Sequence, residues 1–208
     1  MDKKFLYLYI GYPKSASSYL SKNVKNIFNE INHIDVNYNQ YEYNLLNKIF
    51  NSADKEFLKD YNKLESNLDK ILTAHKNYLH WEGALNLLLD YKKKIIFIKR
   101  IKKICIRKNI KLKVIVSFRN HIDLIISFYK ENYLKLIFKN LRYLSFINFF
   151  NTFFINDNYK KNLDYKRLIL DLIKVLGKQN LKIVLFEDLT SNPNFFKSLA
   201  HFFKMKKY

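Results

Sequence analysis

Three segments of the chain carry side chains suited to binding anions. The first is loop 11–18, which contains Lys14 and the serines Ser15, Ser17 and Ser18. An aromatic and β-branched strand is predicted before it and a helix after it. A loop that joins the carboxyl end of a strand to the start of a helix presents free backbone N–H groups and a partial positive charge. The segment therefore predicts a phosphate or sulfate site, the alternative being an ordinary loop with a solvated lysine.

This loop differs from the phosphate-binding loop of common nucleotide kinases. The kinase loop has a second glycine with a lysine directly beside it. Here Gly11 is the single glycine of the loop, and Lys14 follows it by three residues. The sequence therefore disfavours a nucleotide kinase of the usual type.

The second segment predicts another anion site. Residues 112–118 predict a buried strand, Arg119 follows it at once, and Ser127 lies eight residues further on, in a predicted helix. Ligands of parallel sheets bind at the carboxyl ends of the strands, and the planar fork of arginine suits a phosphate. In the alternative interpretation, Arg119 forms an ion pair with Glu187 or Asp188, and Ser127 is a surface residue.

The third segment contains these two acidic residues. Glu187 ends a predicted strand and either organises the arginine end of the site or has a structural role. Ser191, Asn192 and Pro193 then predict the cap of a last helix that reaches Phe203.

The elements that must position these segments alternate along the chain. Strands are predicted at 3–10, 70–74, 112–118 and 181–186, and helices at 19–31, 122–136 and 164–176, the last ending at Gly177. Residues 38–67 predict helices in pieces, and residues 85–108 fit either a strand or a basic amphipathic helix. This alternation predicts an α/β fold, a three-layer parallel sheet flanked by helices, in a single domain over residues 1–208.

Composition excludes several classes of protein. The 208 residues are 49% hydrophobic, which excludes a disordered chain, and the single cysteine, Cys105, excludes an internal disulfide. The net charge is +20, yet only five of the 38 basic residues are arginines. Proteins that recognise nucleic acids rely on bidentate contacts from arginine, so we expect no nucleic-acid partner. A basic nucleic-acid-binding protein remains the least favoured alternative. The charge would still attract an anionic substrate.

Apolar segments of the chain are short. None reaches the ~18 residues that a membrane-spanning helix needs, and the apolar run at the N-terminus lacks the small residues of a signal peptide. We therefore expect a cytoplasmic protein. The Phe-rich run 143–155 is compatible with a buried helix, a lid on the substrate side, or peripheral contact with the inner face of a membrane.

The three anion-binding segments together resemble the sulfotransferase family. Residues 12–20, Tyr-Pro-Lys-Ser-Ala-Ser-Ser-Tyr-Leu, resemble the 5′-phosphosulfate loop of the family, with Ala16 where a glycine is usual. Residues 118–120 with 127–129 resemble its 3′-phosphate motif, and residues 186–203 resemble its carboxyl-terminal segment. The motifs occur in family order across nearly the whole chain, and their style is closest to the bacterial, Golgi-like group that sulfates glycans.

The resemblance implies a P-loop nucleotide-kinase-like sulfotransferase fold and a specific reaction. A sulfuryl group would pass from 3′-phosphoadenylyl sulfate to a hydroxyl or amine of an acceptor, with a saccharide favoured and no metal required. Lys14 would stabilise the leaving phosphate, and Arg119 and Ser127 would hold the 3′-phosphate. The remaining cofactor-binding residues would be those of the loop: Ser15, Ala16, Ser17, Ser18 and Tyr19. The alternative is a degenerate relic that binds the nucleotide without turnover.

The resemblance also bears on the base that accepts the proton of the acceptor. Residues 81–85, Trp-Glu-Gly-Ala-Leu, look like a family segment with a Glu-Gly pair, which favours Glu82 as the catalytic base. His75, just after the strand predicted at 70–74, is the second candidate, because cytosolic members use a histidine. For His80 we favour a structural hydrogen-bonding role.

Overall fold

The computed structural model describes residues 4–12, 17–81, 85, 87 and 89–205 of the chain. They form a five-stranded parallel sheet with strand order β2-β3-β1-β4-β5. The strands are β1 (Lys4–Tyr9), β2 (Asn32–Asp35), β3 (Lys76–His80), β4 (Ile110–Phe118) and β5 (Leu181–Leu185). The predicted α/β fold with a parallel sheet flanked by helices is confirmed.

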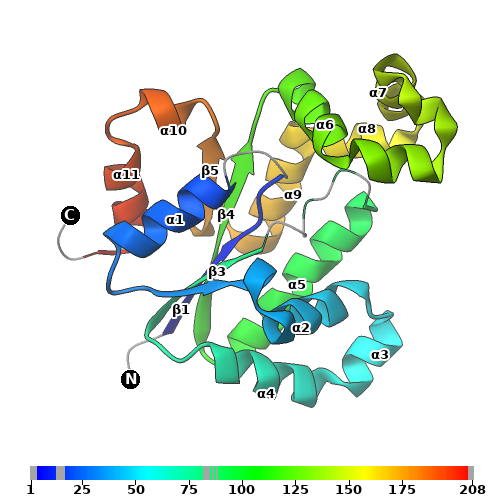
Figure 1. Cartoon of the computed structure of the whole chain (residues 1–208). Coiled ribbons are helices and arrows are strands. Elements are labelled where there is room, and N and C mark those ends of the chain that lie inside the picture. The colour runs from blue at the N-terminus through cyan, green and yellow to red at the C-terminus, as the bar shows by residue number, and fades with distance from the viewer. Residues whose placement is uncertain (1–3, 13–16, 82–84, 86, 88, 206–208) are drawn as a thin grey trace.

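Helices cover both faces of the sheet (Figure 1). Helices α1 (Ser17–Ile27) and α11 (Phe195–Phe202) pack on one face, and α2 (Gln40–Asn51), α4 (Tyr61–Ile71), α5 (Tyr91–Arg107) and α9 (Tyr165–Leu176) pack on the other. The remaining described helices are α3 (Asp54–Lys59), α6 (His121–Lys139), α7 (Phe146–Ile155), α8 (Asp157–Leu163), α10 (Asp188–Ser191) and the 3₁₀ turns η1 (Val36–Tyr38), η3 (Leu141–Leu144) and η4 (Lys178–Asn180).

Strand β1 contributes side chains to the hydrophobic cores on both faces of the sheet, because successive side chains along a strand point to opposite faces. Tyr7 and Tyr9 face α1 and α11, whereas Leu6 and Leu8 face the larger helical layer. All four side chains are buried, so β1 forms the centre of the molecule.

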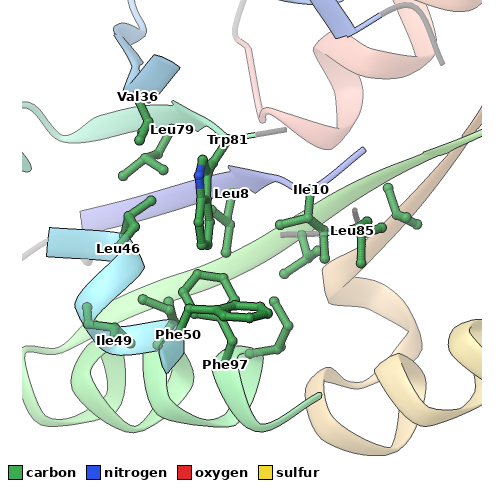
Figure 2. Close-up of a cluster of buried hydrophobic side chains, with 14 of the residues drawn as sticks. Leu8, Ile10, Val36, Leu46, Ile49, Phe50, Leu79, Trp81, Leu85 and Phe97 are labelled. Carbon is green, nitrogen blue, oxygen red and sulfur yellow. The ribbon is translucent and has the colours of Figure 1, made fainter. Parts of the chain in front are cut away.

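Aromatic packing fixes the end of β3 over the larger helical layer. The Trp81 ring lies 4.9 Å from the ring of Phe97 on α5 and 5.8 Å from that of Phe50 on α2. Figure 2 shows this cluster, with Leu8 of β1 beside the indole. Edge-to-face pairs of this kind orient the rings as well as burying them. The chain immediately before Glu82 therefore has a fixed path.

The structure corrects the strand predicted at 70–74. Helix α4 continues to Ile71, and the strand starts at Lys76. Leu64 and Leu68 are buried at helical spacing, and burial of this apolar stripe outweighs the strand-like composition of the following residues. The sequence analysis also missed β2, whose residues Asn32–Asp35 lack the usual apolar content of a strand.

Two other segments are settled by the structure. Residues 91–107 form helix α5, so the amphipathic alternative for 85–108 holds for that stretch. The last predicted helix, capped at residues 191–193, corresponds to α11, and the short helix α10, which was not predicted, precedes Pro193.

The Phe-rich run contains helix α7, which is buried on one side only. Phe149 is buried and its ring lies 5.1 Å from that of Tyr129 on α6. Ile147 and Ile155 are 67% and 81% exposed. Within the described residues, none of the helices combines the length and the apolar character required to cross a bilayer.

Candidate functional site

The end of β1 is tightly packed at the point where the first predicted anion loop begins. The Tyr9 hydroxyl lies 2.5 Å from Ser117 Oγ of β4, and both side chains are buried. A Cβ atom on Gly11 would come within 2.5 Å of Ser117 Oγ and would also collide with the Tyr9 ring. Glycine is therefore required at position 11 by close approach, and it lets the chain leave the sheet toward Lys14.

Helix α1 starts at the other end of this loop. Ser17 is buried in the first turn, whereas Ser18 and Tyr19 are exposed. No acidic residue occupies this first turn, so the positive end of the helix dipole is not neutralised there. Lys14, Ser15 and Ala16 lie outside the described residues, and their predicted roles stay predictions.

Arg119 and Ser127 lie at the end of β4 and on α6. Arg119 directly follows the strand, and its guanidinium carbon lies 4.5 Å from the centre of the Phe186 ring. Its carbonyl accepts a hydrogen bond from the Tyr165 hydroxyl at 2.9 Å. Glu187 accepts a 3.4 Å hydrogen bond from the backbone N–H of Asn120, so the third predicted segment does lie beside the second. The Arg119 side chain is thereby held in place by an aromatic face.

Backbone hydrogen bonds bring these strand ends together at one edge of the sheet. The N–H of Tyr12 points to the Ser117 carbonyl at 3.5 Å, two residues before Arg119. On the opposite side of β1, the N–H of Trp81 donates to the Tyr9 carbonyl at 3.2 Å. Residues 10–12, which directly follow β1, therefore run between the ends of β3 and β4. This is the edge at which parallel sheets bind ligands.

His75 lies at the opposite ends of the strands, where β1 and β3 begin. It precedes β3, and its carbonyl accepts a 2.7 Å hydrogen bond from the N–H of Phe5, near the start of β1. At about 3.3 Å per residue, the rest of β1 separates it by roughly 13 Å or more from the loop at Gly11. The structure does not bring His75 together with Ser17 or Arg119, because the strand that was predicted before His75 follows it instead.

A polar cavity of about 710 Å³ opens beside α1 at the carboxyl ends of β2 and β3. Asp35 is its central residue: its carboxylate lies 3.2 Å from His80 Nδ1 and accepts a 3.2 Å hydrogen bond from the Ser21 hydroxyl. Ser21 Oγ also lies 2.9 Å from His33 Nε2. Ser18 lines the same cavity, so the cavity and the anion loop share the first turn of α1.

The surroundings of this cluster shift the pKa values of two of its members, Asp35 and His33. Burial alone would raise the pKa of Asp35, but hydrogen bonds from His80, Asn37 and Ser21 together with the charge of His80 lower it below its ordinary value. Burial lowers the pKa of His33. Because an ionised Asp35 can only accept, His80 carries a proton on Nδ1, and in the neutral imidazole the basic lone pair is then on Nε2.

Sequence reasoning missed three members of this cluster: Ser21, His33 and Asp35. The available signal was the spacing of His33 and Asp35, which places both on one face of a strand. That signal could not be used without recognising β2. His80, for which a structural hydrogen-bonding role was favoured over that of a base, is buried and bonded to Asp35, and it also lines the cavity. Glu82, two residues further on, lies outside the described residues.

A second buried polar cluster contacts Tyr12, near the start of the predicted anion loop. The Tyr12 hydroxyl donates to the Asn162 carbonyl at 2.5 Å, and Lys94 Nζ donates to Asn162 Oδ1 at 2.7 Å. The Asn162 amide donates to the carbonyls of Leu87 and Leu89, both at 2.7 Å. Burial lowers the pKa of Lys94 from 10.5 to about 7. This cluster joins the start of the loop to the segment after β3.

Other regions are less suited to chemistry. A larger hollow of about 830 Å³ lies between α5 and α9, on outer helical surfaces away from the strand ends. Over the described part of the chain, no group of three or more His, Cys, Asp and Glu side chains is arranged to hold a metal ion.

Comparison with known proteins identifies a fold. No family model and no curated protein sequence matches the chain. The structure is similar to the crystal structure of a sulfotransferase from Alicyclobacillus acidocaldarius, with a TM-score of 0.60 and 15% sequence identity over 95% of this chain and 80% of that chain. The sulfotransferase-like fold predicted from the sequence is therefore confirmed.

Proposed function

We propose that the protein transfers a sulfuryl group from 3′-phosphoadenylyl sulfate to a hydroxyl or amine of an acceptor, with a saccharide as the favoured acceptor. One observation carries the proposal. In a chain with the fold of a sulfotransferase, the N-terminus of α1 and Arg119 at the end of β4 belong to adjacent strand ends. This arrangement suits a nucleotide that carries anionic groups at both ends of its ribose.

The donor side of the proposed site matches two separate anionic groups. The N–H groups and hydroxyls of Ser17 and Ser18, with the positive end of α1, suit the 5′-phosphosulfate. The guanidinium of Arg119, held on the Phe186 ring, and the hydroxyl of Ser127 suit the 3′-phosphate. These side chains support the proposal of this donor, which would supply the activated sulfuryl group.

The chemistry requires one bond to form and one to break. The acceptor oxygen or nitrogen attacks sulfur, its proton passes to a base, and the electron pair of the broken S–O bond stays on the 5′-phosphate oxygen. Lys14 would stabilise the charge that develops on this oxygen, and preorganised donors of this kind are worth roughly 10²–10³-fold in rate.

The carboxyl end of β3 is the place from which a base can act. Glu82 follows this end in the sequence, and His80 lines the cavity there with its Nδ1 held by Asp35. We propose Glu82 as the base and His80 as the alternative. Removal of a general base costs roughly 10²–10⁴-fold in rate. His75, at the opposite ends of the strands, is not retained as a candidate.

Nucleotide binding tests the donor site. Adenosine 3′,5′-bisphosphate at 100 times its dissociation constant should stabilise the protein by about 2.7 kcal/mol, which raises the unfolding midpoint by about 5–10 °C for a chain of this length. Adenosine 5′-monophosphate should do much less, because it lacks the 3′-phosphate. Arg119→Ala should abolish the difference between the two nucleotides. Equal stabilisation of the unmutated protein by both nucleotides would refute the two-phosphate site.

Transfer of radiolabelled sulfate to a saccharide acceptor tests the chemistry. Lys14→Ala should lower the rate by about 10²-fold or more at unchanged stability, since the sequence predicts that this residue lies on a loop. Glu82→Gln should slow transfer strongly with little change in bisphosphate binding, and His75→Ala should have little effect on either. Slow transfer in His80→Gln together with an active Glu82→Gln variant would move the base to His80. A protein that binds the bisphosphate with no transfer under any condition would be the degenerate relic.

A further inference from the structure

The polar cavity between α1, β2 and β3 differs in character from an ordinary surface hollow. Nine described residues line it, and each has a polar or charged side chain. The apolar surface of this wall comes from the rings of Tyr38 and the histidines and from the lysine stems, beside the polar groups that they carry. A ligand rich in hydroxyl groups could replace water here, because the wall can both donate and accept hydrogen bonds.

The rim of the cavity is cationic. Ser18, Ser21, Lys22 and Lys25 lie on one face of α1, because residues three, four and seven positions apart share a helix face. Both lysines are exposed at this rim. The carboxylate that lines the cavity, Asp35, already accepts hydrogen bonds from neighbouring groups within the wall. The charge presented to a ligand is therefore positive.

Tyr38 adds an aromatic surface to the same rim. It ends the 3₁₀ turn η1, which follows β2 and is capped by Asp35, and it is 90% exposed. An exposed ring with a polar tip can pack against the C–H face of a sugar while its hydroxyl stays in water.

We propose that this cavity binds the acceptor and that the acceptor is an acidic saccharide, with a carboxylate or sulfate near Lys22 and Lys25 and a sugar ring against Tyr38. This inference rests on the proposed function, since it places the acceptor hydroxyl at the end of β3 beside the first turn of α1. It adds the acceptor's charge and the residues that select it. His80 and Asp35 would face the reacting end of the sugar.

The test measures binding of an unsulfated chondroitin tetrasaccharide and of its carboxyl-reduced, neutral form by calorimetry at low ionic strength. The acidic form should bind the unmutated protein about 4- to 20-fold more tightly, as expected for two exposed ion pairs. The double variant Lys22→Ala/Lys25→Ala should lose this preference. The control Lys99→Ala/Lys103→Ala removes the same charge from exposed positions on α5, on the other face of the sheet, and should keep the preference.

Tyr38→Ala should lower the affinity for both tetrasaccharides several-fold and by a similar factor. It should not change the stability of the protein, because the side chain is exposed. Equal binding of the two forms, or a preference that survives in Lys22→Ala/Lys25→Ala, would overturn the inference. A preference lost equally in the α5 control would also overturn it, because it would show a general effect of the +20 charge. Bisphosphate binding is measured in parallel. If it fails while the saccharide preference holds, the proposed function is refuted and the assignment of the cavity stands.

Discussion

Burial of Lys94 should make the stability of this protein depend on pH in a defined window. The side chain is 1% exposed and donates to Asn162 Oδ1, and burial lowers its pKa from 10.5 to about 7. Between these two values the unfolded chain binds a proton at this lysine that the folded chain does not. Stability therefore rises with pH from about 7 to about 10.5 and is independent of this group below pH 7.

The magnitude follows from these two pKa values. Each pH unit within the window is worth about 1.4 kcal/mol for one proton, so Lys94 should contribute about 2.5 kcal/mol of additional stability between pH 7.5 and 9.5. Lys94→Met preserves the length of the side chain and removes the charge. The free energy of unfolding of the wild type minus that of this variant should therefore increase by about 2.5 kcal/mol over the same interval.

Urea denaturation at the two pH values measures this difference, provided that the dependence on urea concentration is the same for both proteins. Other titrating groups, including Lys113 with a pKa lowered to about 8 by burial, cancel in the comparison. Lys93→Met is the matched control, because Lys93 is the exposed neighbour on the same helix, and this variant should follow the wild type. If Lys94→Met shows the same pH dependence as the wild type, the buried lysine is not neutral in the folded protein and the reasoning is refuted.

Two further predictions concern the packing of the core. Gly11→Ala should lower the free energy of unfolding by about 1–3 kcal/mol, because a Cβ atom there collides with the Tyr9 ring and Ser117 Oγ; an unchanged urea midpoint would contradict the close approach. The Cys105 thiol is buried, which raises its pKa to about 12, so it should react with an aromatic disulfide reagent at least about 100-fold more slowly in the native protein than in urea. Equal rates in the two states would show that this part of α5 opens readily.

The sequence yields a hypothesis for the donor half of the site because its signals are local. Gly11, Lys14 and the serines are close together in the sequence between a strand and a helix, and Arg119 directly follows a strongly apolar strand. Periodicity and composition define both strands. The edge at which their carboxyl ends meet then follows from the parallel arrangement, without knowledge of the strand order.

The polar cavity proposed to bind the acceptor could not be predicted, because it depends on an edge strand with little sequence signal. Three of the four residues of Asn32–Asp35 are polar, and all four are only partly buried. They form a strand because β3 offers hydrogen-bonding partners, and tertiary context of this kind overrides intrinsic propensity. The position of His75 was predicted wrongly for a similar reason. Strand β3 starts a few residues later than predicted, so His75 lies at the amino ends of the strands and not at their carboxyl ends.

The order of the strands also predicts that the two halves of the proposed site differ in stability. The donor residues follow β1 and β4, each of which is paired on both sides, whereas His33 and Asp35 lie on β2, which pairs only with β3. An edge strand of four residues has few hydrogen bonds to lose, and such regions open at lower free energy than central strands. Besides the ladder with β3, side-chain hydrogen bonds tie β2 to its neighbours, from Ser21 and His80 to Asp35 and from Asn32 to Asn77. If the proposed sites are correct, changes on β2 and η1 should alter which acceptor binds and leave the proposed nucleotide site on the central strands intact.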